Sequence, residues 1–261
     1  MPFNCQPCLR FFHEIQRPTT PPVPPIPPRC ILLGPTGAGK TTFLLQIRNG
    51  GPSAYPVQPT TGPTVEEFPI SGSSSSLVFS DIGGSDRREL RLHFLHAVPI
   101  LDLCILFFID VTASLEELPN TLKDLAYAVT YARSRAGYGT KFVGVVLNKQ
   151  DLLREDEIVR SGRVARITRE VRGAMKEFVG KDGEAGLKWE VLDGGVEGIS
   201  ASTGVGVKDV LMTVVNAVFD GEVPGDAPAQ APVKVKVRDV ATGVAGVAGE
   251  LLSAVKEKVK P

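Results

Sequence analysis

The chain has 261 residues, and its 29 Lys and Arg balance its 29 Asp and Glu, so the formal net charge is zero. This balance gives no electrostatic argument for nucleic-acid binding, and the length suits one sizeable α/β domain with appendages. The longest apolar stretch, around 103–109, is far shorter than the ~18–20 residues of a membrane span, and no secretory signal is recognised. Four cysteines do not make a disulfide framework in a chain this long, which favours a reducing cytosolic compartment.

Composition divides the chain into four parts. Residues 1–28 carry repeated Pro-Pro pairs, which favour extended polyproline II or disorder. Residues 29–220 form the predicted globular domain, and residues 221–232 read as a linker. Residues 233–261 form a basic tail with helical apolar spacing, but its glycines make an isolated helix marginal. Conditional binding to a membrane or partner and plain disorder both stay open for this tail.

Strand and helix patterns alternate inside the globular domain. We expect strands at 29–33, 64–70, 76–80, 103–109, 142–147 and within 188–200, and helices at 40–48, 114–134, 155–179 and 206–219. Strands that are apolar almost throughout indicate a sheet buried on both faces. The pattern therefore predicts a doubly wound, mostly parallel six-stranded sheet with helices on both faces, and ligands at the carboxyl ends of its strands.

The first motif follows the first expected strand, where residues 34–41 match the phosphate-loop pattern G-x-x-x-x-G-K-[ST]. Its glycines allow backbone amides to turn inward as an anion-binding nest, and the following helix N-terminus adds partial positive charge. Lys40 can reach the β- and γ-phosphates, and the Thr41 hydroxyl can ligate magnesium. The predicted phosphate-binding residues are Gly34, Pro35, Thr36, Gly37, Ala38, Gly39, Lys40, Thr41, Thr42 and, further along, Gly84. A glycine-rich turn that binds nothing is the alternative, and the flanking strand and helix disfavour it.

The second motif, Asn148-Lys149-Gln150-Asp151, follows the strand expected at 142–147. The Asp151 carboxylate can accept both the ring N–H and the exocyclic amine of guanine, and adenine does not offer that pair of donors. An unpaired buried carboxylate at this position would reject the wrong base strongly. Asn148 would tie this loop to the phosphate loop, and the Lys149 stem would lie on the base. A chance match in a polar loop is the alternative.

Two weaker segments fall into order with these motifs. In residues 81–84, Asp81 is placed to hold magnesium through water, and the Gly84 amide can face a γ-phosphate. The segment Ser200-Ala201-Ser202 precedes the last helix, where the Ala201 amide can contact the guanine carbonyl. Each segment is weak alone, but together with the first two motifs they predict a guanine-nucleotide site.

The whole set resembles a small GTPase of the Ras superfamily, in the ADP-ribosylation factor (Arf) and Arf-like branch, over about residues 29–219. The resemblance is carried by residues 37–42, 59–62 with 65–66, 81–84 and 148–152. It implies that Thr60, with Thr61 as the alternative register, is the switch threonine that closes on magnesium and the γ-phosphate. The implied catalytic residues are Lys40, Thr60, Gly84 and Ser85; the metal residues are Thr41, Thr60 and Asp81; the guanine residues are Asn148, Lys149, Asp151, Ser200, Ala201 and Ser202. It further implies GTP, GDP and Mg²⁺ as ligands, an exchange factor, an activating protein and effectors as partners, and a monomer.

The sequence departs from the Arf pattern at two places. Ser85 stands where Arf-like proteins have the glutamine that orients the attacking water, and serine is too short to do so. We therefore expect slow GTP hydrolysis, unless a partner or Asp86 supplies the missing group. The start Met1-Pro2 lacks the glycine needed for myristoylation, so acylation of Cys5 or Cys8 and unmodified thiols are the two alternatives there.

Two functions follow from these observations. One is an Arf-like molecular switch in the cytoplasm, acting in membrane traffic, with peripheral endomembrane contact through its arms. The other is a GTP-bound adaptor with deficient hydrolysis, similar to the signal recognition particle receptor β-subunit. Ser85 favours the adaptor, whereas the intact magnesium and guanine residues favour the switch.

The helix expected at 155–179 carries an arginine at every third position from 160 to 172. Its buried stripe is predicted at Val164, Ile167, Val171, Met175 and Phe178. A solvated face is the simplest interpretation of the arginines, and an acidic partner or lipid headgroups are the alternatives.

Overall fold

A computed structural model of the protein describes residues 27–51, 57, 60, 62–70, 75–83, 95, 103–134, 139–153, 157–179 and 187–219. The strands are β1 Arg29–Leu33, β2 Thr64–Pro69, β3 Ser76–Asp81, β4 Leu103–Asp110, β5 Thr140–Asn148 and β6 Lys188–Leu192. The helices are α1 Lys40–Asn49, α3 Leu118–Ser134, α4 Glu157–Val179 and α5 Val207–Val218, with a short 3-10 helix at Gln150–Leu152. These elements lie close to the ranges expected from the sequence.

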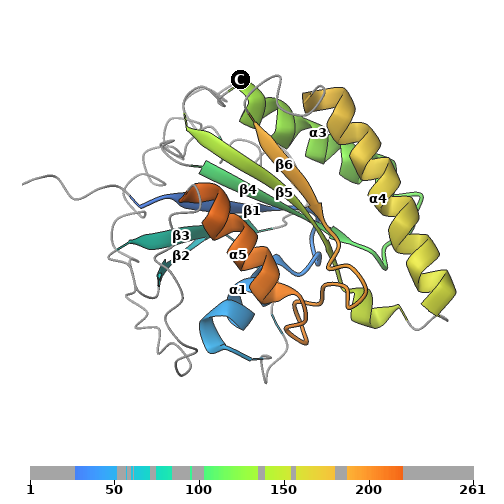
Figure 1. Ribbon diagram of the computed structural model, residues 1–261, viewed down its shortest axis with the longest axis horizontal. Coiled ribbons are helices and arrows are strands. Elements are labelled where there is room, and N and C mark those ends of the chain that lie inside the picture. The colour runs from blue at the N-terminus through green and yellow to red at the C-terminus, as the bar shows by residue number, and fades with distance from the viewer. Residues whose placement is uncertain are drawn as a thin grey trace, which may run out of the picture.

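The strands form one six-stranded sheet in the order β2-β3-β1-β4-β5-β6. β2 pairs antiparallel with β3, and the other neighbouring strands pair in parallel. Helices α3 and α4 cover one face of the sheet, and α1 and α5 cover the other (Figure 1). The predicted doubly wound, mostly parallel architecture of a small G domain is confirmed.

The apolar strand β4 shows why the sheet is buried on both faces. Side chains alternate between the two faces of a strand, so an all-apolar strand supplies two cores. Leu103, Ile105 and Phe107 contribute to the core beneath α3 and α4, whereas Leu106 and Phe108 contribute to the core beneath α1 and α5. Because β1, β3, β4, β5 and β6 pair in parallel, their carboxyl ends lie at the same edge of the sheet. The two main motifs follow β1 and β5 at this edge.

Small differences from the expected ranges have local causes. Residues 114–117 form turns before α3, with the Glu116 N–H donating to Ser114 Oγ (3.2 Å) and the Glu117 N–H donating to Ser114 O (3.0 Å). The helix accordingly begins at Leu118 rather than at residue 114. Among the described residues, none of the helices has the length and apolar content that crossing a bilayer requires. Of the N-terminal arm predicted at 1–28, the structure describes only residues 27 and 28, and the predicted linker at 221–232 and tail at 233–261 lie outside the described residues.

Candidate functional site

The phosphate-loop segment joins β1 to α1 and depends on glycine at two points. Gly34 has φ 133°, and a Cβ there would lie 2.3 Å from Phe108 O. Gly39 has φ 92°, and a Cβ there would lie 2.2 Å from Asn148 Nδ2. A side chain at either position would meet both backbone strain and a collision. The loop therefore passes directly over the end of β4 and against the second motif.

Lys40 holds the loop from inside. It is 5% exposed at the first position of α1, and its Nζ donates to Gly34 O and to Pro35 O, each at 2.9 Å. These hydrogen bonds place an ammonium group among the backbone groups of the loop. Thr36 is exposed and Thr42 is half-buried, so the loop's outer side faces solvent.

Asn148 joins the two main motifs to a third segment. Its Nδ2 donates to Ala38 O at 2.8 Å, and its Oδ1 accepts from the Ala201 N–H at 2.9 Å. Asn148 is 1% exposed, so both hydrogen bonds are shielded from water. The tie expected between Asn148 and the phosphate loop is confirmed. Because the Ala201 amide already donates to Asn148, a contact with a guanine carbonyl would have to share this N–H.

Lys149 adopts the left-handed conformation with φ 68°, the one non-glycine residue with positive φ in the described part of the chain. Such a backbone costs of order 1–3 kcal/mol and persists only where neighbours hold it. Its Nζ donates to Asp110 Oδ2 at 2.7 Å, and the Thr112 N–H and hydroxyl donate to Asp110 Oδ1. Although partial burial raises the pKa of Asp110, these hydrogen bonds and the Lys149 charge outweigh it, and the net pKa lies below its usual value.

Asp151 lies at the surface. Its carboxylate is exposed and accepts a hydrogen bond from Ser202 Oγ at 3.0 Å. The reason is local, because Asp151 lies on a one-turn 3-10 helix at the surface and the Ser202 loop comes within reach. Ser202 Oγ also lies 3.0 Å from the hydroxyl of Ser200, which is 2% exposed. Any base selection by Asp151 would therefore rest on hydrogen-bond pairing rather than on a carboxylate that is already buried.

The three predicted metal residues come together from three segments. Thr41 Oγ1 donates to Asp81 Oδ2 at 2.5 Å and lies 2.7 Å from Thr60 Oγ1. Thr60 Oγ1 also donates to Asp81 Oδ2, at 3.5 Å. Thr61 lies outside the described residues, so the position of Thr60 is the only register that the structure describes.

The Asp81 carboxylate is suited to a cation. It is fully buried, and its Oδ1 has no hydrogen-bond partner among the described residues. Burial raises the pKa of Asp81 above its usual value, although hydrogen bonds from the two threonines and the charge of Lys40 act in the opposite direction. One carboxylate with two hydroxyls is the hard oxygen donor set that Mg²⁺ takes, with few protein ligands. The described residues hold no group of three or more His, Cys, Asp and Glu side chains that would suit a different metal.

Sequence reasoning missed Gln150 and Asp110. Gln150 is 5% exposed; its Nε2 donates to Leu147 O (2.9 Å) and Asp193 O (2.7 Å), and its N–H donates to Ile199 O (3.1 Å). It fastens the second motif to the loop between β6 and α5. The motif leaves this position unspecified, so the sequence carried no signal for it. Asp110 lies one residue beyond the strand expected at 103–109, and its carboxylate gains a role only from its contacts with Thr112 and Lys149.

Some predicted site residues are not described. Gly84 and Ser85, together with Asp86, Cys5 and Cys8, lie outside the described residues. Their expected contacts with the γ-phosphate, water or a lipid stay predictions.

The model of the ADP-ribosylation factor family matches residues 27–176, which is more than half of the chain. Among solved structures, the chain is similar to one from Chaetomium thermophilum described as the signal recognition particle receptor SRb-GTP/SRX complex. That likeness has 20% identity and a TM-score of 0.46, and it covers 64% of this chain and 90% of the other. The comparison with curated proteins found no match.

Proposed function

Because the chain belongs to the ADP-ribosylation factor family of GTP-binding proteins, we propose that it is a magnesium-dependent guanine-nucleotide switch. The observation that carries the proposal is Asn148, whose one side chain bonds to the phosphate loop at Ala38 and to the loop at Ala201. It brings the anion-binding segment and the guanine-selective motif into one rigid unit. A nucleotide that spans both segments would bind across this junction.

Each residue in the site has a distinct proposed task. The amides of residues 34–41 and the Lys40 ammonium bind the phosphates, and the phosphates would compete with Gly34 O and Pro35 O for that ammonium. Asp151 accepts the two guanine donors, and Ser202 holds its carboxylate in place. Lys149, fixed by Asp110, lays its stem beside the base.

Thr41, Thr60 and Asp81 would hold Mg²⁺. The ion supplies charge neutralisation at the β- and γ-phosphates when it is bound. Thr60 reports the γ-phosphate, since loss of that group would release the segment that carries it and change which partner the surface fits. We propose an exchange factor, an activating protein and effectors as its partners, a monomeric state, and a role in membrane traffic in the cytoplasm with peripheral endomembrane contact.

Nucleotide specificity tests the proposal directly. Calorimetry of the purified chain with Mg²⁺ is expected to give tight binding of GTP and GDP and much weaker binding of ATP. Binding of GTP is expected to weaken when the divalent ion is chelated, because the phosphate charges then repel one another. Equal affinity for ATP and GTP, or no binding of either, would overturn the proposal.

Hydrolysis distinguishes the two possible modes of action. We propose that Ser85 makes GTP turnover slow, because serine cannot position the attacking water. Single-turnover measurements should give a low rate that rises in Ser85→Gln, with unchanged nucleotide content. Near-zero turnover in both proteins, with GTP still bound, would instead indicate a GTP-bound adaptor that works by protein interaction alone.

A further inference from the structure

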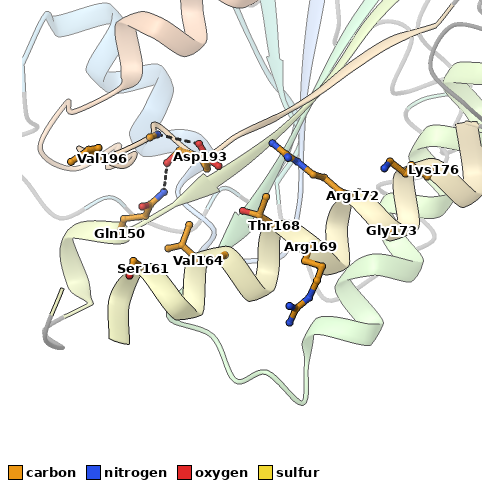
Figure 2. Close-up of a pocket in the computed structure, with 12 residues that line it drawn as sticks. Gln150, Ser161, Val164, Thr168, Arg169, Arg172, Gly173, Lys176, Asp193 and Val196 are labelled. Carbon is orange, nitrogen blue, oxygen red and sulfur yellow. Dashed lines mark hydrogen bonds between the residues drawn. The ribbon is translucent and has the colours of Figure 1, made fainter. Parts of the chain in front are cut away.

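A hollow lies between α4 and the loop that joins β6 to α5, next to the proposed guanine motif (Figure 2). Its volume is about 840 Å³, within the ~300–1,000 Å³ range of binding clefts. Val164, Thr168 and Arg172 line it from the helix, and Asp193 and Val196 line it from the loop. We call this hollow the α4 groove.

The α4 groove is rich in positive charge. Arg169, Arg172 and Lys176 line it and are exposed, and none of them forms an ion pair with another described residue. Figure 2 shows Arg172 and Lys176 extending from the same side of α4 as Thr168, whereas Arg169 points the other way. The acidic residue of the lining, Asp193, uses its Oδ1 to accept the Gly195 N–H at 3.1 Å. Within the described part of the chain, no carboxylate neutralises these cations.

A buried polar atom lies beside these cations. Thr168 is 9% exposed, lines the groove, and its Oγ1 has no hydrogen-bond partner among the described residues. A buried hydroxyl without a partner is destabilising, so a ligand that reaches it would recover part of that loss. Apolar surface adjoins it, because Val164 is half-buried, Ala165 is exposed and Val196 is 84% exposed.

We propose that the α4 groove docks an acidic segment of a partner protein, with carboxylates on Arg172 and Lys176 and apolar side chains against Val164 and Val196. Charge complementarity favours the acidic segment, and the adjoining apolar surface favours a peptide over a free anion. A lipid surface fits less well, since a flat layer of headgroups cannot enter the groove and reach the Thr168 hydroxyl. The regularly spaced arginines of α4 therefore lie on different faces of the helix. Arg172 lines the groove, whereas Arg163 donates hydrogen bonds to Val111 O and Ala113 O.

The groove adjoins the guanine motif but does not depend on it. Gln150 lines one end and hydrogen-bonds to Asp193 O (Figure 2). The docking proposal stands on the α4 cations and Thr168, so it can be tested whether or not the nucleotide proposal holds.

The test measures binding of a short fluorescein-labelled peptide of alternating glutamate and leucine to the full chain by fluorescence anisotropy. Saturable binding is expected, weakened about tenfold in the double variant R172E/K176E. The matched control R166E/K208E makes the same change in net charge at exposed positions that do not line the groove. It should bind the peptide as the natural chain does.

A third variant separates the groove from general electrostatics. Thr168→Val keeps the size of the side chain and removes the hydroxyl. It should therefore weaken peptide binding while leaving the unfolding midpoint unchanged or raised. The single tryptophan, Trp189, reports that midpoint by fluorescence. The proposal would be overturned if the peptide did not bind, or if R166E/K208E weakened peptide binding as much as R172E/K176E does. It would also be overturned if phosphatidylserine vesicles bound through Arg172 and Lys176 while the peptide failed to bind.

Discussion

The phosphate loop and the guanine motif are neighbours, but they are built in different ways. The loop is held by buried backbone contacts, with Lys40 and Asn148 both donating to its carbonyls. Asp151, in contrast, is exposed and is held by one hydroxyl, Ser202. In the proposed nucleotide site, the loop would supply affinity through a preformed backbone, and the motif would supply selectivity through one accessible carboxylate. The two parts can be broken separately.

The largest effect is expected where the two parts touch. Gly39→Ala should lower the free energy of unfolding by about 2–4 kcal/mol, because its Cβ would collide with Asn148 Nδ2 in a left-handed backbone. GTP binding should fall with it. Urea unfolding followed by Trp189 fluorescence, together with nucleotide calorimetry, measures both.

Gly37→Ala is the matched control for this variant. Gly37 also has a left-handed backbone, φ 77°, but no atom lies within 4 Å of its Cβ position. It should lose only the backbone term of about 1–2 kcal/mol. In an Asn148→Ala background, Gly39→Ala should cost less, and equal losses in both backgrounds would show that the contact with Asn148 is not what constrains Gly39.

A smaller effect, confined to nucleotide selectivity, is expected in the guanine motif. Asp151→Asn should weaken GDP binding by about 1.5–3 kcal/mol, because a charged acceptor is replaced by an amide. Xanthosine diphosphate should gain affinity, since its ring carbonyl can accept from the new amide. Glu197→Gln removes a charge from an exposed position on the neighbouring loop and should change neither affinity. If Asp151→Asn lost binding of both GDP and xanthosine diphosphate, the result would indicate a structural role for Asp151.

The smallest effect is expected at the ion pair between Lys149 of the guanine motif and Asp110. Asp110→Asn should lower the free energy of unfolding by about 0.5–1 kcal/mol at pH 7, because Lys149 loses its charged partner. The pKa of Asp110 is depressed in the folded protein, so its contribution is present above the unfolded value of about 4 and is lost as the pH falls through the lower folded value.

The stabilities of the variant and the natural chain, measured by urea unfolding at pH 7 and at acid pH, should therefore converge as the pH falls through the folded pKa of Asp110. Glu190→Gln, at an exposed position on β6, should give no comparable difference at either pH. A difference between Asp110→Asn and the natural chain that stays constant with pH would contradict the ion pair.

Much of the fold could be predicted from the sequence, because the patterns that indicate its strands and loops lie within short segments. The run at 103–109 has the apolar content of a doubly buried strand, and Gly34 to Thr41 follow β1 at a fixed spacing. The start of α3 was less readable, since residue 114 fits a helical pattern and only the Ser114 hydrogen bonds show a turn. Exposure of Asp151 was also beyond sequence reasoning, because it depends on where the Ser202 loop lies.

The sequence by itself determined the alternation of strands and helices, the phosphate loop and the guanine motif, because periodicity and motif spacing are properties of neighbours along the chain. Only the tertiary structure decided that Gln150 links two loops, that Lys149 pairs with Asp110, and that Arg172 and Arg163 face different surroundings. These contacts join segments that are distant in sequence, and their distances are set by how the sheet and helices pack.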